Sequence, residues 1–595
     1  MNILGIHDGH TSTAALMQDG KIIGCVSEER FNRLKCYDGF PKESIKYLLN
    51  LCDHKIDLVA IGTTDLLPHE SFAGREYLFS VEDYLQQQYE HFYPIFYNKK
   101  NPSTTKKKFF EKMMKKYSKK ILNNYQFNKN FKISYDGKKD VINFREIRIN
   151  TIKKMLKIDR NKIFFIDHHK CHANHAYYSS PFRNKTTIIT ADGVGDRGVN
   201  ATVSVAYKNN IKKIFETTNQ NIGRLWRYIT LVMGMKPQQH EYKVMGLAPY
   251  ADKNIEDKVY NELKQYQIVK GIDFKYVKKP KDLYFYFRNK FEKFRFDGIA
   301  GGIQKYTEEI FSKWVENIIK KTKNKNLVFS GGISMNIKLN LILHKIKKIK
   351  NFYVSASGAD ESIAIGACYE LSNQKLPLSD VYLGPSLDIS NLDKRLKKSF
   401  NKKFFTILKP KRINELLAKK INEGKIVARC IDRMEFGARA LGNRSILANP
   451  SDINSVKMIN TLVKQRDFWM PFTPSIIFEK HKKYIKNPKN IFSPHMTIAF
   501  ESTELGKKHL KAAMHPYDET VRPQMLKKKD NPNYYDLIKE FEKVSGISAL
   551  LNTSYNLHGF PIVCNVSDAI STFKKTKIDI LQLDDYLVIR KNFEH

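Results

Sequence analysis

The sequence predicts an α/β protein, and two observations support this fold class. Short apolar runs typical of β-strands alternate with helical stretches such as residues 43–51. A strand, a turn and a further strand occur over residues 1–27 and again over 186–207, each with a glycine-containing loop, which indicates a duplicated unit. Two such loops that face each other would hold a nucleotide. The predicted strands are residues 3–6, 21–27, 58–62, 162–166, 186–190, 200–207 and 327–329.

The length of 595 residues exceeds what one hydrophobic core usually serves, so we expect two large domains. A turn-rich patch over residues 371–385 is typical of a domain junction. The first domain is therefore expected over 1–372 and the second over 378–595. Within the first, a Lys-rich insertion at about 97–150, with a helix near 106–123, is expected to be a surface excursion rather than a core element.

The start of the chain reads as a strand that runs into a turn, with neither the basic start nor the cleavage site of a signal peptide. No apolar run reaches the roughly 18 residues that a bilayer requires. The 7 cysteines include no Cys-x-x-Cys pair, which argues against a disulfide framework and against a zinc ribbon. We expect a cytoplasmic protein with reduced thiols and no transmembrane segment.

The formal net charge of +41 favours a polyanionic partner, because clustered Lys and Arg are the footprint of such binding. The lysines, however, are spread along the whole chain among Asn, Ile, Tyr and Phe, as an AT-rich genome would produce. Only residues 99–139 resemble a dedicated basic region. A solvated charged face is the default interpretation, and anionic substrates or a lipid surface are favoured over nucleic acid.

His168 and His172 lie four residues apart, a spacing that places both imidazoles on one helical face where they could close on one divalent ion. A carboxylate is the natural further ligand, and Asp192 and Asp360 are the candidates. In the alternative interpretation, His168 and His172 make ordinary hydrogen bonds while His169 and His175 face solvent.

Two glycine loops predict a nucleotide site. Gly193 and Gly195 follow a strand, and glycines there let backbone N–H groups approach a phosphate. A second loop follows another strand and precedes a helix, whose N-terminus accepts an anion; its candidate residues are Gly331, Gly332 and Asn336. Lys243, embedded among apolar residues near Glu241, is expected to pair with it beside the ligand, or else to form a surface ion pair.

His10, in a short loop after the first strand, is a candidate general base, and the alternative is a loop histidine that bonds only to backbone. In the second domain, cations set among glycines and turn residues predict a pocket for a phosphate or carboxylate, because guanidinium forks match such oxygens in pairs. The alternative is solvated surface cations. The set is Arg439, Arg444, Lys464 and Arg466, with His515 and Arg522 as additions.

Taken together, these residues resemble the carbamoyltransferase family, which includes the nodulation carbamoyltransferases and the O-carbamoyltransferases of the tobramycin and cephamycin pathways. The resemblance runs nearly end to end and leaves only residues 97–150 uncovered. Its motifs are residues 27–31, the His168/His172 pair, 192–195, 241–250, 330–340, 358–367, 437–445, 464–474 and 551–563.

The resemblance implies a first domain similar to the Kae-type members of the actin-like ATPase fold and a second domain similar to YrdC. In that family the second domain uses carbamoyl phosphate and ATP with Mg²⁺ to form a carbamoyl-adenylate, and the first passes the carbamoyl group to a hydroxyl. By matching position, His168, His172 and Asp360 look like ligands of a divalent metal, with Fe²⁺ the family's ion and Asp192 close to it. His10 looks like the base at the acceptor.

The same resemblance assigns carbamoyl phosphate to the second domain. Arg439, Arg444, Lys464 and Arg466, with Arg522, would neutralise it, while Asn552 and Ser554 offer neutral donors and acceptors fitted to a carbamoyl amide. The chain departs from the family pattern at Ala438, at Glu519 and at Asp467. These changes are expected to alter the stiffness of the loops and the affinity for substrate rather than to abolish activity.

The expected activity is therefore O-carbamoylation of a sugar, a glycan precursor or a secondary metabolite, and a homodimer stays open. Two alternatives remain. Threonylcarbamoylation of transfer RNA would use similar domains, and the net positive charge would then bind the RNA phosphates. The affinity for transfer RNA should in that case fall steeply as salt rises. A nucleotide-binding scaffold that has lost turnover would keep the fold alone.

Overall fold

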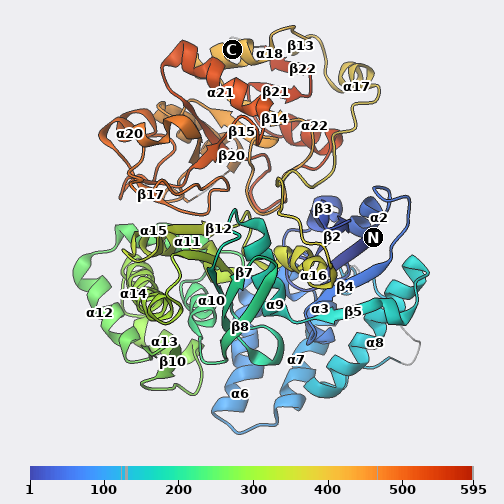
Figure 1. Cartoon of the computed structure of the whole chain (residues 1–595), viewed down its shortest axis with the longest axis vertical. Coiled ribbons are helices and arrows are strands. Elements are labelled where there is room, and N and C mark those ends of the chain that lie inside the picture. The colour runs from blue at the N-terminus through green and yellow to red at the C-terminus, as the bar shows by residue number, and fades with distance from the viewer. Residues whose placement is uncertain (122–123, 127–130, 465–466, 592–595) are drawn as a thin grey trace. The chain divides into compact units, whose positions relative to one another are not determined.

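The computed structural model describes residues 1–121, 124–126, 131–464 and 467–591. The chain divides into two compact units, Met1–Leu378 (unit 1) and Ser379–His595 (unit 2), and each is described by itself (Figure 1). Both units combine β-sheets with helices, so the predicted α/β class is confirmed.

Unit 1 contains two five-stranded sheets of the same design. In the first, β1, β2 and β3 form an antiparallel meander, and β4 and then β5 continue from β1 in parallel. In the second, β6, β7 and β8 form the meander, and β11 and then β12 continue from β6 in parallel. The strands are β1 (Asn2–His7), β2 (Thr13–Gln18), β3 (Lys21–Ser27), β4 (Leu58–Gly62), β5 (Ile163–Ile166), β6 (Thr186–Ala191), β7 (Ala201–Tyr207), β8 (Asn210–Thr217), β11 (Asn326–Ser330) and β12 (Asn351–Val354).

The predicted duplication is thus confirmed, and each predicted strand has a counterpart within about one residue at either end. Within these two sheets the prediction missed β2, β8 and β12, and it included no strand of unit 2. The repeat is therefore a three-stranded meander with two parallel additions, and each addition needs a crossover connection.

Two helices, α9 (His168–Ser179) and α16 (Ile363–Leu371), pack on each other, and α16 also packs on β1 and β4. Glycines allow this close approach. A Cβ atom at Gly5 would lie 2.0 Å from the carbonyl oxygen of Ala364, and one at Gly366 would lie 1.9 Å from that of Cys171. The start of α9, the end of β1 and the start of α16 are therefore held in fixed register.

The Lys-rich segment corrects the expectation of a surface excursion. Helix α7 (Pro102–Tyr117) buries Phe109, Phe110 and Met113, and α8 (Gly137–Leu156) buries Phe144 against the core residues of β1 and β4. The apolar residues of both helices recur at helical spacing between charged ones, so the helices hide a core-facing stripe beneath a basic exterior.

The remaining elements of unit 1 surround the sheets. They are α1 (Glu29–Asn32), α2 (Lys42–Leu49), α3 (Pro68–Ala73), α4 (Arg75–Leu78), α5 (Val81–Gln87), η1 (Gln88–Phe92), α6 (Tyr93–Phe96), α10 (Ile222–Val232), α11 (Glu241–Leu247), α12 (Lys253–Lys264), the pair β9 (Gln267–Lys270) and β10 (Asp273–Tyr276), α13 (Tyr284–Phe291), α14 (Phe296–Thr322) and α15 (Ile337–Lys345).

Unit 2 is built on one eight-stranded sheet of mixed direction, with a buried apolar core that includes Ile446, Leu551 and Leu581. In spatial order its strands are β13 (Phe405–Leu408), β22 (Tyr586–Arg590), β21 (Ile580–Leu583), β14 (Val427–Cys430), β15 (Arg444–Ala448), β20 (Ala549–Ser554), β16 (Thr473–Ile477) and β19 (Gln524–Leu526). The other elements are α17 (Leu392–Ser399), α18 (Ile413–Asn422), α19 (Ile453–Ile459), η7 (Asn460–Lys464), the pair β17 (Phe500–Glu501) and β18 (Thr520–Val521), α20 (Glu504–His509), α21 (Pro532–Ser545) and α22 (Val566–Lys574).

Among the described helices, none combines the length and the apolar character needed to cross a bilayer. All 7 cysteines have free thiols, and all but Cys36 are buried.

Candidate active site

Four predicted ligands converge in unit 1. His168 and His172 stand on the first turns of α9, Asp192 follows β6 directly, and Asp360 immediately precedes α16. One ligand atom from each of these residues lies within 4.8 Å of the others. Elements from both halves of the duplication therefore bring two imidazoles and two carboxylates to one point.

Within this cluster the Nε2 atoms of both histidines face the carboxylates. His172 Nε2 lies 3.2 Å from Asp192 Oδ2 and 3.5 Å from Asp360 Oδ1, and the corresponding distances for His168 are 3.6 and 3.8 Å. Both imidazoles are buried, and neither Nε2 has a hydrogen-bond partner among the described residues. Two imidazole nitrogens and two carboxylates that converge at these distances without a well-formed hydrogen bond between them indicate a site for a ligand.

The opposite edges of the two rings are anchored. His168 Nδ1 is hydrogen-bonded to Thr63 Oγ1 at 3.2 Å, and His172 Nδ1 to Ser330 Oγ at 3.3 Å. Bonds of this kind orient a metal-ligating histidine and set its tautomer. The donor set fits a divalent transition metal, for which imidazole and carboxylate are common ligands.

The carboxylates also control the charge of the cluster. Burial lowers the pKa of His168, but Asp192 and Asp360 outweigh burial and raise that pKa to about 9. Conversely, burial raises the pKa of Asp192, but the two histidines hold it well below its usual range. Burial likewise raises the pKa of Asp360, but the histidines outweigh burial and lower it. Both carboxylates are therefore anionic at neutral pH, as metal ligands must be.

The alternative interpretation of the histidine cluster is wrong in one respect, because His169 and His175 do not face solvent. His169 is buried and hydrogen-bonded to Thr190 Oγ1 at 2.8 Å and to the carbonyl oxygen of Val199 at 3.0 Å. His175 is buried and bonded to the carbonyl oxygen of Ser357 at 3.0 Å. These two imidazoles hold α9 in place.

The loop after β1 lies beside the cluster. His7 Nε2 is 3.9 Å from Asp360 Oδ2 and is hydrogen-bonded to the carbonyl oxygen of His10 at 3.1 Å. His7 is nearly fully buried, and burial lowers its pKa to about 4. A neutral imidazole thus lines the carboxylate cluster, a position that the sequence analysis did not assign to His7 although it noted the loop.

His10 faces a carboxylate on α4. Its Nδ1 lies 3.6 Å from Glu76 Oε2, and neither atom has a hydrogen-bond partner among the described residues. Burial lowers the pKa of His10, but Glu76 and then Asp360 outweigh it, so the pKa is raised overall. Glu76 is a further candidate that the sequence did not reveal, because 65 residues separate it from His10 in the chain.

The same loop is braced by a buried ion pair. Asp8 accepts hydrogen bonds from Arg148 of α8, at 2.8 Å from Nε and 2.6 Å from Nη2. Arg148 also donates to the carbonyl oxygen of Thr63 at 3.0 Å, and Thr63 in turn bonds His168. The helix that was expected to lie on the surface therefore positions both the loop with His10 and the metal-site candidate His168.

The two glycine loops meet at Asp192. Gly193 N donates to Asp192 Oδ1 at 2.6 Å, and Gly332 N donates to Asp192 Oδ2 at 3.1 Å. Gly331 has a φ of +92°, and a Cβ atom there would lie 2.2 Å from the carbonyl oxygen of Ala191, so only glycine fits. Gly195 is also confined, because a Cβ atom would lie 2.8 Å from the His169 ring.

Two other nucleotide-site candidates have local roles. Asn336 caps α15 through a bond from Leu339 N at 2.9 Å, and its side-chain amide pairs with Gln304. Lys243 is half-buried on α11, where Glu241 accepts from Gln238 N at 2.6 Å. Burial raises the pKa of Glu241 to about 7.

In unit 2 the structure corrects the role of Arg444. Its side chain is fully buried, and its guanidinium donates to backbone carbonyl oxygens of five residues, which satisfies it without an anion. The acceptors are Ile431, Asp432, Asn443, Cys564 and Pro385. Arg444 is thus a structural cation that ties several loops to β15, contrary to the expected phosphate contact.

The loop before β15 is held by a buried glutamate that was not among the predicted site residues. Glu435 Oε1 accepts from the backbone N–H groups of Leu441, Asn443 and Arg444 at 2.7, 2.9 and 3.0 Å. The loop carries Arg439, which is half-buried. A buried carboxylate bound by three N–H groups therefore fixes the loop shape.

The polar candidates on β20 differ in their environment. Asn552 is buried, and its Nδ2 donates to Ser475 Oγ at 3.0 Å and to the carbonyl oxygen of Ala440 at 3.2 Å. Its Oδ1 is buried without a hydrogen-bond partner among the described residues. Ser554 Oγ donates to Asn556 Oδ1 at 2.7 Å.

The remaining cations are only partly described. Arg522 is half-buried just before β19. Arg466 and the side chain of Lys464 lie outside the described part of the chain, so the predicted cation pocket stays a prediction.

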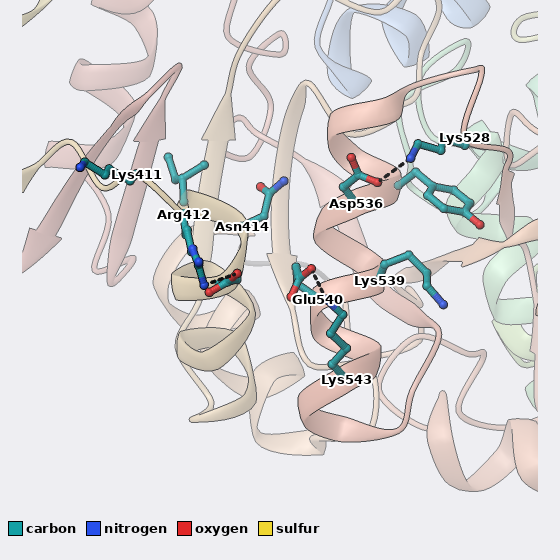
Figure 2. A pocket seen from close by; sticks show the side chains of 11 residues that line it. Lys411, Arg412, Asn414, Lys528, Asp536, Lys539, Glu540 and Lys543 are labelled. Atoms are coloured by element: carbon teal, nitrogen blue, oxygen red, sulfur yellow. Dashed lines mark hydrogen bonds and ion pairs between the residues drawn. The ribbon is translucent and has the colours of Figure 1, made fainter.

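A surface groove of about 540 Å³ lies between α18 and α21 of unit 2 (Figure 2). Four of its five lining cations are paired with carboxylates, as in Lys528 with Asp536 at 3.7 Å and Arg412 with Glu415 at 3.4 Å. Because most of these cations are already paired and none of the predicted site residues lines the groove, it does not replace the predicted anion pocket.

Family comparison agrees with this arrangement. A family model described as "Carbamoyltransferase N-terminus" matches residues 2–369, and one described as "Carbamoyltransferase C-terminus" matches residues 418–590. The chain belongs to the carbamoyltransferase family. The family resemblance is confirmed, and the protein is a carbamoyl-transferring enzyme.

Relatives of this carbamoyltransferase match it over most of its length. The uncharacterized protein MJ1051 of Methanocaldococcus jannaschii is 30% identical over 600 residues, which cover 98% of this chain and 99% of that protein. MJ1058 of the same organism is 33% identical over 469 residues, 74% of this chain and 76% of that protein. The nodulation protein NolNO of Sinorhizobium fredii is 27% identical over 619 residues, 98% of this chain and 79% of that protein.

Proposed function

We propose that this carbamoyltransferase is ATP- and metal-dependent and transfers a carbamoyl group to a hydroxyl of a sugar, a glycan precursor or a secondary metabolite. Unit 2 would form carbamoyl-adenylate from carbamoyl phosphate and ATP, and unit 1 would use it. The observation that carries the proposal is that the buried Nε2 atoms of His168 and His172 converge with the carboxylates of Asp192 and Asp360, one ligand atom of each lying within 4.8 Å of the others.

These four residues would hold one divalent metal, and Fe²⁺ follows from the family resemblance. When bound, such an ion supplies positive charge that stabilises the phosphate oxygens of a leaving adenylate. Thr63 and Ser330 would keep the two imidazoles oriented through their Nδ1 atoms.

The glycine loops support the nucleotide part of the proposal. Gly193 and Gly332 bring both loops to Asp192, whose carboxylate accepts from their N–H groups. A Cβ atom at Gly193 would meet nothing within 4 Å, so a phosphate can approach the backbone of that loop. The duplicated sheets of unit 1 support a Kae-type, actin-like ATPase fold, and the single mixed sheet of unit 2 is compatible with a YrdC-like domain. ATP with Mg²⁺ would bind through backbone groups rather than through Asn336, which caps a helix.

Transfer requires a base at the acceptor, and His10 has that role in the proposal. The acceptor oxygen attacks the carbamoyl carbon, the bond from that carbon to the phosphate oxygen breaks, and AMP leaves. The hydroxyl proton goes to an imidazole nitrogen of His10, and Glu76 stabilises the resulting imidazolium through Nδ1.

Activation would use the polar residues of unit 2. Carbamoyl phosphate, ATP and one water yield carbamoyl-adenylate, phosphate and pyrophosphate. The orphaned Oδ1 of Asn552 suits the amide hydrogens of a carbamoyl group. Arg439, Arg522, Lys464 and Arg466 would neutralise the phosphates, whereas Arg444 would not take part.

The activation step can be tested without an acceptor. Metal-loaded protein is incubated with carbamoyl phosphate and ATP, and carbamoyl-adenylate and pyrophosphate are followed by mass spectrometry. We expect both products from the wild type, none from Arg439→Ala, and normal yields from Lys543→Ala, a surface control in the same unit. His172→Ala should keep adenylate formation while losing bound metal and transfer. Failure of the wild type to consume carbamoyl phosphate with any divalent metal would refute the proposal.

A further inference from the structure

An aromatic patch is exposed on unit 1, away from the residues discussed above. Its members, on η1 and around α6, are Tyr89, Tyr93, Phe96 and Tyr97, with 47, 39, 39 and 40% of their surface exposed. In Figure 1, α6 and the loop that leads to α7 lie at the periphery of unit 1. Large aromatic side chains gathered on one short surface segment indicate an interaction surface.

The patch is rigid rather than a loose loop. The rings of Tyr89, Tyr93 and Tyr97 pack around Phe285 of α13, with centroid distances of 5.2, 5.1 and 6.0 Å. Tyr97 also donates a hydrogen bond to the buried Asp282. The exposed ring edges are therefore presented in a fixed arrangement.

Cations border this patch. Lys99 and Lys100 are exposed immediately after it, and Lys281 lies 5.8 Å from the Tyr97 ring. Arg288 bonds the hydroxyl of Tyr89. Glu90 is neutralised by Lys112 and Glu292 by Arg288, so the excess positive charge comes from Lys99, Lys100 and Lys281, set against the carboxylate of Asp282. Positive charge therefore predominates around the aromatic side chains.

We infer that the aromatic patch and its lysines dock on an anionic lipid surface. Aromatic rings with polar tips favour the headgroup level of a bilayer, and lysines beside them are attracted by anionic lipids. A second copy of this chain does not fit, because the same positive charge would face itself. The inference is independent of the proposed function and adds a site of action at a membrane surface.

The ring geometry favours lipid over single-stranded nucleic acid. Tyr93 and Tyr97 stack on each other at 4.8 Å with an interplanar angle of 25°, and Phe92 and Phe96 are nearly parallel at 6.2 Å and 11°. Nucleobases need open ring faces for stacking. Here neighbouring rings cover faces and leave edges exposed, which suits insertion between headgroups.

Vesicle sedimentation tests this inference with the full chain. The wild type should sediment with vesicles of phosphatidylcholine and phosphatidylglycerol, far less with phosphatidylcholine alone, and progressively less as salt rises. Lys99→Gln/Lys100→Gln should weaken binding about 30-fold, equivalent to about 1 kcal/mol for each lysine near the surface. Tyr93→Ser/Phe96→Ser should also weaken binding.

The matched control is Lys320→Gln/Lys321→Gln, two exposed lysines at the end of α14, which removes the same charge and should leave binding nearly unchanged. If both lysine double variants lost vesicle binding equally, the binding would depend on the overall charge of the protein rather than on the patch, and the inference would be overturned. It would also be overturned by a wild type that ignores anionic vesicles, or by one that binds single-stranded RNA through the patch instead. If the aromatic variant fails to fold, the comparison of the two lysine double variants still tests whether vesicle binding depends on the patch.

Discussion

The cluster in unit 1 and the cation set in unit 2 were predicted by similar reasoning, yet they differ in how their polar atoms are used. In the cluster, His168 and His172 bond through Nδ1 and leave Nε2 without a hydrogen-bond partner among the described residues. In unit 2, Arg444 donates to the backbone oxygens of five residues. A polar or charged residue in a family motif thus indicates a ligand site only when the folded protein leaves one of its polar atoms without a hydrogen-bond partner.

The largest expected effect is at the cluster. His172→Ala should lower carbamoyl transfer about 1,000-fold, because a bound metal contributes several kcal/mol of transition-state stabilisation. Metal content by elemental analysis and transfer to an acceptor measure it. His54→Asn, which replaces an exposed imidazole with a residue tolerant of its positive φ, is the control. Full metal content in His172→Ala would contradict the assignment of the metal site to this cluster.

Substitutions of Arg444 and Arg439 should separate a structural arginine from one proposed to bind phosphate in unit 2. Arg444→Ala leaves several buried carbonyl oxygens without donors, so we expect a loss of about 3 to 5 kcal/mol in the free energy of unfolding. Arg439→Ala should change stability by no more than about 0.5 kcal/mol while abolishing adenylate formation. Chemical denaturation followed by circular dichroism measures both. A stable but inactive Arg444→Ala protein would return Arg444 to the anion pocket.

Arg148 tests whether α8 supports the cluster. Arg148→Ala leaves Asp8 as a buried unpaired charge, and we expect a loss of about 3 kcal/mol in the free energy of unfolding together with weaker transfer. Urea denaturation and transfer rates report the two effects. Arg145→Ala, which removes a more exposed cation from the same helix, serves as the control. Unchanged stability would mean that the Asp8 pair does not brace the loop.

The smallest predicted effect concerns pH. Glu76 raises the pKa of His10, so Glu76→Gln, which removes that negative charge, should lower the pKa of His10. His10 would then be deprotonated at lower pH, and the acidic limb of the kcat/KM profile for transfer should move to lower pH. A profile that stays in place or moves upward would contradict the pairing of Glu76 with His10.

Local pattern was sufficient for seven strands of unit 1 and for the His168/His172 pair. The predicted strands are short apolar runs beside turns, and His168 and His172 share a helix, so spacing alone placed them together. Distant partners were not accessible in this way. Glu76 faces His10 and Arg148 faces Asp8 only because separate elements pack together, and the Lys-rich composition of α7 and α8 concealed their apolar stripes.

The glycine contacts around α16 limit how this site can change. Gly5 and Gly366 sit where even a methyl group would collide with backbone oxygen atoms, at 2.0 and 1.9 Å. Backbone cannot yield as a flexible side chain can, so β1, α9 and α16 behave as one rigid block. His7, His172 and Asp360 stand at the ends of these three elements, and any drift in one would carry the others with it. Changes in substrate choice are therefore more easily accommodated by the surrounding loops than by this block.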